Sequence, residues 1–432
     1  MKRFNAWIAA LLLMASTTSL AAETPDAMAT RLLDHLDAAQ YDAAEAMFSA
    51  QMKAAVPADK LKAVWESLPA QMGAAGKRGP AQHSVEGGYR IVVIPLDYAN
   101  GRLQARIVLD ANDQVAGFLV QPAAPAAATP PAADAGFIEQ DVHVPPSGSF
   151  QHGLPATLAL PKGKGPFPAV VLVHGSGPQD RDETIGPNRP FLDIARGLAA
   201  QGIAVLRYDK RTRARPQDFS GPFSIDDETT NDAVAAVAAL AANPAIDPHR
   251  IVVLGHSQGG MLAGRIAQAS AGKVAGLVLF AAPARPILDI LIEQNRYMLG
   301  LDGSISAEEQ TQLDTLTASI TEVRRNPDAT LMQLPGRFWQ QLEQLDPVAD
   351  ARATQLPVLL LQGGRDFQVV DADWRRWKQG LQGDRHAFKH YPALNHLGIA
   401  GEGLASPQEY QRPGQVDATL VNDIAHWIKA LR

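Results

Sequence analysis

The residues that most clearly indicate catalytic chemistry lie in the segment 250–260, where Gly255, Ser257 and Gly259 form the pattern G-x-S-x-G. An apolar run that predicts a buried strand precedes the pattern, and helical sequence follows it. A serine on such a sharp strand-to-helix turn projects its hydroxyl freely. The turn needs small residues two positions before and after the serine, because the backbone passes close there. We therefore interpret Ser257 as a nucleophile.

A serine hydroxyl becomes a nucleophile only when a base removes its proton and a carboxylate orients that base. In folds with this type of turn, the acid and the base follow the serine in chain order. Asp366 comes directly after the apolar run 356–364, and His396 lies on the loop after the last predicted strand, 386–391. The sequence therefore predicts a catalytic triad of Ser257, Asp366 and His396.

The other acids and histidines nearby have ordinary structural explanations. Asp371 and Asp373 fall in the first turn of a predicted helix, where acidic residues interact favourably with the helix dipole. His256 adjoins the nucleophile, so its side chain points away from it, and we expect it to pack in the interior. The remaining histidines after the predicted acid lie in a strand or in the terminal helix: His386, His390 and His426.

An oxyanion formed by attack of the serine needs two preorganised backbone N–H donors. One is the N–H of Gln258, directly after the nucleophile. We expect the other to be Ser176, on a glycine-rich loop after the apolar strand 168–175. The charged run 180–183 is expected to hold the shape of this loop, with substrate contact as an alternative role for Arg181.

The elements that must position these residues alternate between strands and helices. A hairpin-like pair, 137–144 and 154–161, comes first, and continuous apolar runs typical of buried parallel strands follow. The pattern predicts a doubly wound, mostly parallel sheet in an α/β domain, residues 136–432. The alternation lapses into helical sequence at about 284–350, which predicts an inserted helical cap. The apolar runs are residues 168–175, 202–209, 250–257, 274–282 and 356–364.

A small α+β accessory domain is predicted for residues 23–121. Apolar residues at three- and four-residue spacing indicate three amphipathic helices, and β-rich segments follow them. Asn100 and Gly101 suit a hairpin turn between the first two strands. An Ala/Pro tract, residues 122–135, predicts an extended linker to the next domain. The predicted helices are 24–40, 41–56 and 57–72, and the strands are 89–98, 102–110 and 115–121.

Composition and the first residues limit the compartment and the partners. Residues 1–22 read as a signal peptide, with Lys2 and Arg3 before an apolar run shorter than a membrane span, so we expect a periplasmic or secreted protein without a membrane anchor. The chain has no cysteine, which excludes disulfides and a thiol nucleophile. A net charge of -6 without basic runs argues against nucleic acid as a partner. Metal-binding motifs are absent from the sequence, and we expect neither a metal nor a cofactor.

Several segments of the second domain resemble a group of secreted bacterial esterases in the α/β-hydrolase superfamily, labelled dienelactone-hydrolase-like or serine-aminopeptidase-like. The resemblance implies ester hydrolysis without a cofactor. The first domain resembles a small domain of unknown function found ahead of such hydrolases. The segments that carry the resemblance are 174–195, 205–212, 255–260, 361–369, 391–397 and 401–416.

Two functions of the same fold compete. We expect an esterase that acts on a small-molecule ester, and a serine peptidase or aminopeptidase is the alternative. The cap is expected to roof the pocket, with at least one of the adjacent residues Phe338 and Trp339 facing it. For the accessory domain we considered two roles, a ligand-binding module and a homodimer interface.

Overall fold

A computed structural model describes residues 23–99, 101–123 and 129–431. Three predicted features lie wholly or partly outside the described residues: the signal peptide 1–22, the turn at Asn100, and the linker at 124–128. The chain divides into two compact units, Met1–Ala124 and Pro125–Arg432, and this division falls within the predicted linker segment. In the part of the chain that is described, no helix is long and apolar enough to cross a membrane.

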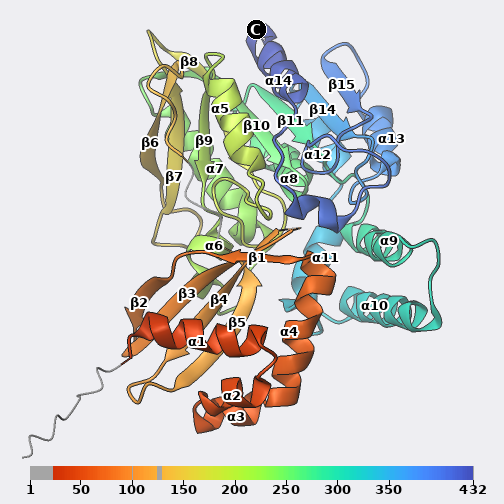
Figure 1. Ribbon diagram of the computed structural model, residues 1–432. Helices are drawn as coiled ribbons and strands as arrows, with labels where there is room; N and C mark the ends of the chain where they lie inside the picture. Colours follow the sequence, from red (N-terminus) through yellow and green to blue (C-terminus); the bar gives the residue numbers. More distant parts are fainter. Residues whose placement is uncertain (1–22, 100, 124–128, 432) are drawn as a thin grey trace, which may run out of the picture. The chain divides into compact units, whose positions relative to one another are not determined.

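The first unit packs helices against an antiparallel sheet (Figure 1). Its helices are α1 (Pro25–Asp37), α2 (Tyr41–Ala46), α3 (Ala50–Ala55) and α4 (Ala58–Met72). Its strands are β1 (Ala75–Arg78), β2 (Gln82–Glu86), β3 (Tyr89–Tyr98), β4 (Gly101–Leu109) and β5 (Val115–Pro122). The strand order is β1-β3-β4-β5, with β2 paired to β3. Leu32 and Leu33 of α1 share a buried core with Ile107 of β4, so the predicted α+β domain is confirmed.

The structure of this unit differs from the predicted elements in three respects. The predicted helix 41–56 is broken, because Phe48 is fully buried and forms a backbone bridge with Val115, after which Ser49 caps a new helix. The short polar strands β1 and β2 were not predicted. Gly101 pairs with Tyr98 as the first residue of β4, so it belongs to the strand and not to the turn.

The second unit is built on an eight-stranded sheet, shown in yellow to blue in Figure 1. Its strands are β6 (Phe137–Val144), β7 (Leu154–Pro161), β8 (Phe167–Val173), β9 (Ala204–Tyr208), β10 (Ile246–His256), β11 (Gly276–Phe280), β14 (Val358–Gly363) and β15 (His386–Tyr391). The order is β15-β14-β11-β10-β8-β9-β7-β6. The neighbours from β15 to β9 are parallel, whereas β7 pairs antiparallel with both β9 and β6. The predicted mostly parallel sheet is therefore confirmed.

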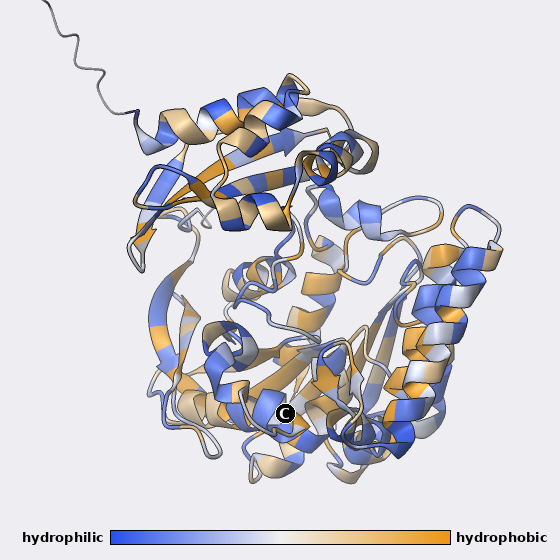
Figure 2. Ribbon diagram, turned by 90° about the horizontal axis from the view of Figure 1, so that it is seen from below, coloured by the Kyte–Doolittle hydropathy of each residue, from blue (hydrophilic) through white to orange (hydrophobic). Residues whose placement is uncertain are grey.

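Helices cover both faces of this sheet, which explains why its central strands, from β14 to β9, contain continuous apolar runs. The longer helices are α5 (Pro190–Ala199), α7 (Asn231–Ala241), α8 (Gln258–Ala269), α13 (Asp371–Gly380) and α14 (Ala418–Ala430). Val170 and Leu172 of β8 share a core with α5 and α14. Val171 and Val173 point to the opposite face, into a core with α7 and α8. In Figure 2 these strands are largely orange, whereas the surrounding helices carry both blue and orange segments.

Short helical segments connect the strands at the edge where the predicted catalytic loops gather. They are α6 (Arg211–Ala214), the 3₁₀ turns η1 (Pro216–Phe219) and η3 (Pro407–Gln411), and the π-helical turn η2 (Asp226–Thr230). The first three elements in chain order, α6, η1 and η2, lie between β9 and α7. None of these four segments was predicted, and three of them, α6, η1 and η2, contribute residues to the cavity described below.

A largely helical insertion separates β11 from β14. It contains α9 (Ile287–Leu299), α10 (Ala307–Arg325), β12 (Thr330–Leu331), β13 (Leu334–Pro335), α11 (Gly336–Glu343) and α12 (Pro347–Ala353). At its start, the carboxylate of Asp373 in α13 accepts hydrogen bonds from the backbone N–H groups of Ala284 (2.8 Å) and Arg285 (3.0 Å). Met332 and Gln333, which join β12 to β13, both have positive φ angles, 50° and 64°.

The end of the insertion packs on the helix that follows the nucleophile. A Cβ atom on Gly264 of α8 would lie 2.5 Å from the backbone nitrogen of Ala351 in α12. Real Cβ atoms do not approach backbone this closely, so glycine is required for the two helices to touch. The insertion is therefore fastened to the sheet unit at both ends, by Asp373 and by Gly264.

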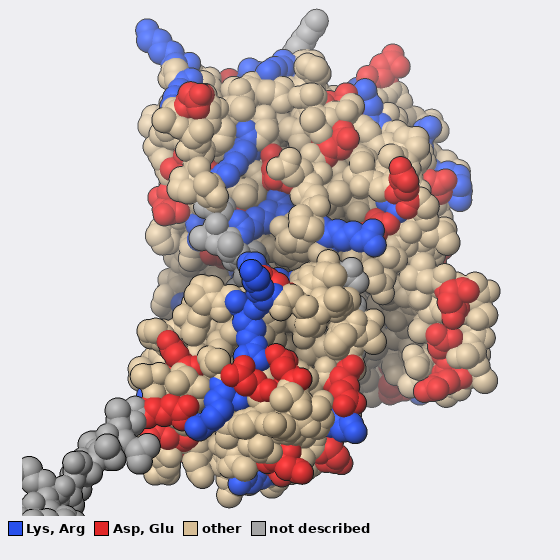
Figure 3. Space-filling view, viewed as in Figure 1, with Lys and Arg blue, Asp and Glu red and all other residues tan. Residues whose placement is uncertain are grey.

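Charged side chains of both signs are interspersed on the surface in view in Figure 3. Many of them are paired, as with Arg78 and Asp34 (2.6 Å) in the first unit and Arg324 and Asp289 (2.6 Å) in the second. Each exposed pair contributes only about 0–1 kcal/mol to stability. The surface pairs therefore matter less to the fold of the second unit than the two cores on opposite faces of its sheet.

We predict that Gly264→Ala destabilises the second unit by about 1–3 kcal/mol, because the added methyl group forces α8 and α12 apart. Gly221→Ala is the matched control, since a Cβ there meets no atom within 4 Å and its φ lies outside the left-handed region. Urea unfolding followed by circular dichroism measures both. Equal stability of the two variants would contradict the close packing of α8 on α12.

Candidate active site

Ser257 occupies a strained turn between β10 and α8, with φ 51° and ψ -120°. A Cβ on Gly255 would lie 2.2 Å from the carbonyl oxygen of Gly259, and one on Gly259 would lie 2.2 Å from that of Val173. Both positions therefore exclude every side chain. Strain of this kind persists only where surrounding structure enforces it, and it is common at active sites. The turn has the geometry that the G-x-S-x-G pattern predicts.

Asp366 and His396 meet at the carboxyl ends of β14 and β15. The Nδ1 atom of His396 lies 2.8 Å from Oδ2 of Asp366, and both residues are buried. The other carboxylate oxygen of Asp366 accepts the backbone N–H groups of Gln368 (2.8 Å) and Val369 (3.0 Å). The carboxylate is thus fixed by its own loop and oriented toward the imidazole.

Asp371 and Asp373 do not contact His396 in any described hydrogen bond. Asp371 is an exposed residue in the first turn of α13, 3.9 Å from Arg375 and 3.6 Å from His390. Asp373 is fully buried, and its partners are the start of the insertion and the guanidinium of Arg285. Its structural role is therefore larger than a position at a helix start suggests.

The loop after β8 lies against the nucleophile. A Cβ on Gly175 would lie 3.2 Å from the Cβ of Ser257. Ser176 and Gly177 line the same cavity as Ser257 and Gln258. Gln258 begins α8, so its backbone N–H is one of the unpaired donors at a helix N-terminus, where negative charge is favoured. The two predicted oxyanion donors therefore border one cavity with the predicted nucleophile.

A buried ion pair that sequence patterns did not indicate joins this loop to the nucleophile turn. Oε1 of Glu183 accepts the backbone N–H of Gly175 (2.7 Å), and Oε2 lies 2.9 Å from Nδ1 of His256. Burial raises the pKa of Glu183 and lowers that of His256, but the attraction between the two groups outweighs it. The pKa of Glu183 is consequently lowered and that of His256 is raised.

His256 also connects the nucleophile turn to the loop of the predicted base. Its Nε2 lies 2.9 Å from the backbone carbonyl oxygen of His396, and the two rings are 4.7 Å apart. Nδ1 of the same ring lies 2.9 Å from Oε2 of Glu183. The interior position expected for His256 is observed, and the side chain additionally links three loops of the site.

The charged run after the loop is occupied by structural contacts. Arg181 forms a two-point interaction with Asp209 (3.1 and 2.9 Å) and donates to Thr157 (2.8 Å). Arg181 is not among the residues that line the cavity. Burial lowers the pKa of His174 to about 4, so its ring is neutral, and Nε2–H donates to the carbonyl oxygen of Asp180 (3.0 Å).

A second buried ion pair lies on the other side of the loop. Nζ of Lys210 lies 2.5 Å from Oε1 of Glu228 and donates to the carbonyl oxygen of Gly175 (2.8 Å). Oε2 of Glu228 accepts the side-chain N–H of Gln258 (2.9 Å). Lys210 follows β9 directly and Glu228 lies in η2. No periodic pattern relates the two positions, which explains why the sequence did not reveal the pair.

The cavity beside Ser257 has a volume of about 570 Å³. Its apolar side chains come mainly from two regions, the connection between β9 and α7 and the insertion, and the loops after β8, β10 and β14 complete its walls. Among the described residues that line it, Glu228 alone carries a charge. Both Phe338 and Trp339 border the cavity. The apolar lining includes Phe219, Phe223, Ile287, Leu291, Leu334, Phe338 and Trp339.

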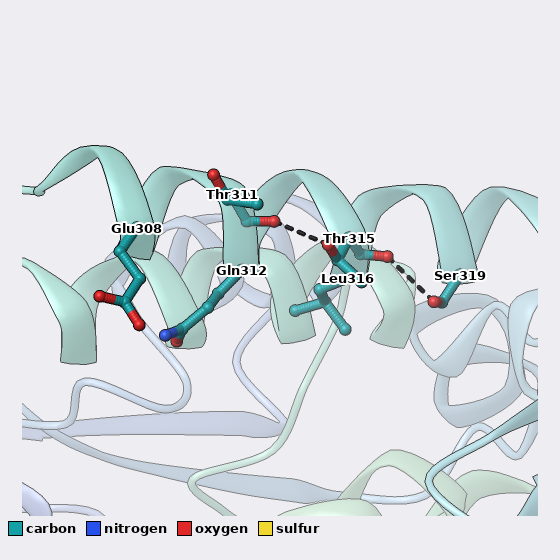
Figure 4. A pocket seen from close by; sticks show the side chains of 6 residues that line it. All are labelled: Glu308, Thr311, Gln312, Thr315, Leu316 and Ser319. Carbon is teal, nitrogen blue, oxygen red and sulfur yellow. Dashed lines mark hydrogen bonds between the residues drawn. The ribbon is translucent and has the colours of Figure 1, made fainter.

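A hollow on α10, shown in Figure 4, lies away from Ser257 and lacks the features of a ligand site. The hydroxyls of Thr315 and Ser319 donate to helix carbonyls one turn earlier, at 2.8 and 2.9 Å. Side chains that bond to their own helix have no donor left for a ligand. In the described part of the chain, no group of three or more His, Asp or Glu side chains is arranged to hold a metal ion.

The sequence was compared with protein families and with known proteins. A family model described as "Serine aminopeptidase, S33" matches residues 166–402, and one described as "Protein of unknown function (DUF3887)" matches residues 29–118. Esterase EstD of Thermotoga maritima is 36% identical over 409 residues, which cover 93% of this chain and 95% of EstD.

Similar solved structures include an esterase of Pyrobaculum calidifontis, with 18% identity, a TM-score of 0.44, and coverage of 68% of this chain and 86% of that one. Another is 2,6-dihydroxy-pseudo-oxynicotine hydrolase, with 15% identity, a TM-score of 0.44 and coverage of 68% of each chain. One family model matches more than half of the sequence, and the similarity to EstD extends along nearly the whole length of both chains. The chain therefore belongs to the serine aminopeptidase (S33) family of α/β-hydrolases and is a hydrolase of the carboxylesterase type.

Proposed function

We propose that this enzyme hydrolyses carboxylic esters through an acyl-enzyme formed on Ser257, with His396 as the general base and Asp366 as the group that orients it. The observation that carries the proposal is the 2.8 Å hydrogen bond between Nδ1 of His396 and Oδ2 of Asp366. This bond favours the tautomer with its proton on Nδ1, which leaves a lone pair on Nε2. A lone pair on Nε2 is what removal of the serine proton requires.

In the acylation step, Oγ of Ser257 attacks the ester carbonyl carbon while its proton passes to Nε2 of His396. The N–H groups of Ser176 and Gln258 stabilise the negative charge on the former carbonyl oxygen. The tetrahedral intermediate then collapses, and the protonated His396 gives its proton to the departing alcohol. Asp366 stabilises the imidazolium and remains ionised throughout.

In the deacylation step, water replaces the alcohol. His396 removes a proton from the water as it attacks the acyl carbon, and the same N–H groups stabilise the second oxyanion. Return of the proton to Oγ of Ser257 releases the carboxylic acid. No residue outside the triad and the two donors is needed to balance the reaction.

The cavity favours a neutral ester with an apolar acyl group over an aminoacyl substrate. An aminopeptidase must hold a substrate ammonium group, which requires a carboxylate that is free to pair with it. Glu228, the charged residue of the lining, is already paired with Lys210 and bonded to Gln258. The aromatic and aliphatic lining instead suits an acyl chain, and about 570 Å³ is within the usual range for small-molecule sites.

We expect the wild-type enzyme to hydrolyse p-nitrophenyl esters and to leave aminoacyl p-nitroanilides largely intact. Ser257→Ala is the control, and its kcat for esters should fall by about 10⁴-fold because the nucleophile is lost. A fluorophosphonate probe followed by peptide mapping should label Ser257. Efficient anilide hydrolysis would favour the peptidase, whereas near-normal ester hydrolysis by the alanine variant would exclude Ser257 as the nucleophile.

Asp366→Asn should fold normally and reduce kcat by about 10⁴-fold, since an amide at this position favours the wrong imidazole tautomer. Asp371→Asn is the matched control from the same segment, because its carboxylate is exposed and lies near Arg375 and His390. Steady-state kinetics with p-nitrophenyl butyrate compares the two. Similar kinetics of both variants would place the triad acid elsewhere.

Phe338→Ala should enlarge the cavity and shift the preference of kcat/KM from acetyl and butyryl esters toward octanoyl esters. Leu342→Ala is the control, because Leu342 is equally buried in α11 but does not border the cavity. Both changes remove a large apolar side chain and are expected to cost several kcal/mol of stability, about 2–5 kcal/mol each. An unchanged chain-length ranking in Phe338→Ala would show that this side chain only packs.

A further inference from the structure

Lys210 is a buried cation that the proposed chemistry does not use. It is 2% exposed, and its ammonium group is held between Glu228 (2.5 Å) and the carbonyl oxygen of Gly175 (2.8 Å). Its backbone N–H donates to the carbonyl oxygen of Gln179, farther along the same loop (3.0 Å). Lysine is almost never fully buried without a specific partner, and this one is directed at a single peptide group.

That peptide group is the one that carries the proposed oxyanion donor. The carbonyl of Gly175 and the N–H of Ser176 belong to one planar trans peptide unit, so they point in opposite directions. Fixing the carbonyl toward Nζ of Lys210 therefore fixes the direction of the Ser176 N–H. The preceding N–H, of Gly175, is held by Glu183 at 2.7 Å, so the glycine is held on both sides.

The partner of Lys210 reaches the second donor. Oε2 of Glu228 accepts the side-chain N–H of Gln258, the residue whose backbone N–H is the other proposed donor. One buried ion pair thus contacts the peptide unit that carries one proposed donor and the side chain of the residue that carries the other. The carboxylate balances the lysine charge, so the resting site gains no net charge from the pair.

Lys210 also strengthens the Ser176 N–H as a hydrogen-bond donor. A cation that hydrogen-bonds a peptide oxygen polarises the amide, because chains of hydrogen bonds strengthen one another. The N–H on the far side of that amide becomes a better donor, and this matters most in a site where water is excluded. The contribution grows as negative charge develops on the substrate oxygen, so it is larger in the transition state than in the ground state.

We propose that Lys210, supported by Glu228, is a positioning residue of the oxyanion hole that aligns and polarises the Gly175–Ser176 peptide. This inference rests on the proposed function, in which Ser257 is the nucleophile and the Ser176 N–H is an oxyanion donor. Lys210 does not touch the substrate in this role. Its removal should therefore affect kcat and leave KM nearly unchanged.

The test compares Lys210→Met with Arg211→Met. Arg211 is the next residue and is also fully buried, in ion pairs with Asp232 (2.7 Å) and Asp218 (2.9 Å). In the described hydrogen bonds and ion pairs, it contacts no atom of the loop after β8 that contains Gly175. Both variants should lose thermal stability, measured as Tm. Only Lys210→Met should lose about a hundredfold in kcat for p-nitrophenyl butyrate, similar to loss of one oxyanion-hole donor.

Inhibitor affinity separates positioning from general loosening of the site. The hydroxyl of the nucleophilic serine adds to the carbonyl of an alkyl trifluoromethyl ketone, and the adduct carries an oxyanion. The matching methyl ketone forms no such adduct and binds as a ground-state analogue. Lys210→Met should weaken the trifluoromethyl ketone about as much as it lowers kcat and leave the methyl ketone unchanged. Lys210→Arg, which keeps the charge, should recover part of both losses. Equal kcat and equal inhibitor affinities in Lys210→Met and Arg211→Met would overturn the inference.

Two further measurements keep the result interpretable. If Lys210→Met does not fold, the neutral pair Lys210→Met/Glu228→Gln replaces it, because removing both charges avoids an unpaired buried ion. The double variant is expected to show the same loss of kcat, and wild-type kcat in it would overturn the inference. Failure of the proposed function gives a different result from failure of the inference about Lys210. In that case the wild-type enzyme would not be inhibited by the trifluoromethyl ketone, and Ser257→Ala would retain activity.

Discussion

The close approach of three backbone segments around Ser257 is the constraint on which the rest of the site depends. Gly255, Gly259 and the end of β8 at Val173 leave no room for a Cβ atom. The turn can form only if β8, β10 and α8 are held at fixed separations, and the eight-stranded sheet with its two helical layers supplies that rigidity. Strain at one residue is thus maintained by packing over the whole unit.

Buried charge has a common use in this unit, which is to hold loops rather than to add stability. Lys210, paired with Glu228, bonds the carbonyl oxygen of Gly175, and Glu183, paired with His256, accepts the N–H of the same glycine. Asp373 holds the start of the insertion. Desolvation makes such pairs poor sources of net stability. These pairs instead fix the conformation of the loops, because any conformation that separates the partners leaves an uncompensated buried charge.

The features that could be predicted from the sequence are those encoded by neighbouring residues. The strand-turn-helix around Ser257 combines a local glycine pattern with an apolar run, and Asp366 and His396 each follow a recognisable strand. The parallel sheet was predictable because its strands are buried on both faces. The roles of the triad and of the oxyanion donors stay predictions that the proposed experiments test.

What could not be predicted depends on contacts between distant residues. Glu183 with His256 and Lys210 with Glu228 are joined only by the fold, and no spacing in the sequence relates them. The break between α2 and α3 has the same origin, since the helical periodicity continues through Phe48 but a backbone bridge to Val115 overrides it. Tertiary contacts outweigh local preference in each of these cases.

The insertion between β11 and β14 leaves and rejoins the sheet unit at two fixed points, Asp373 and Gly264. A segment whose ends are already fixed can change length at little expense, because each doubling of a loop adds only about 0.6 kcal/mol of closure entropy. The predicted catalytic side chains lie on the loops after β10, β14 and β15, outside the insertion. A longer or shorter insertion can therefore be accommodated between the same two fixed points while β10, β14 and β15 keep their places in the sheet.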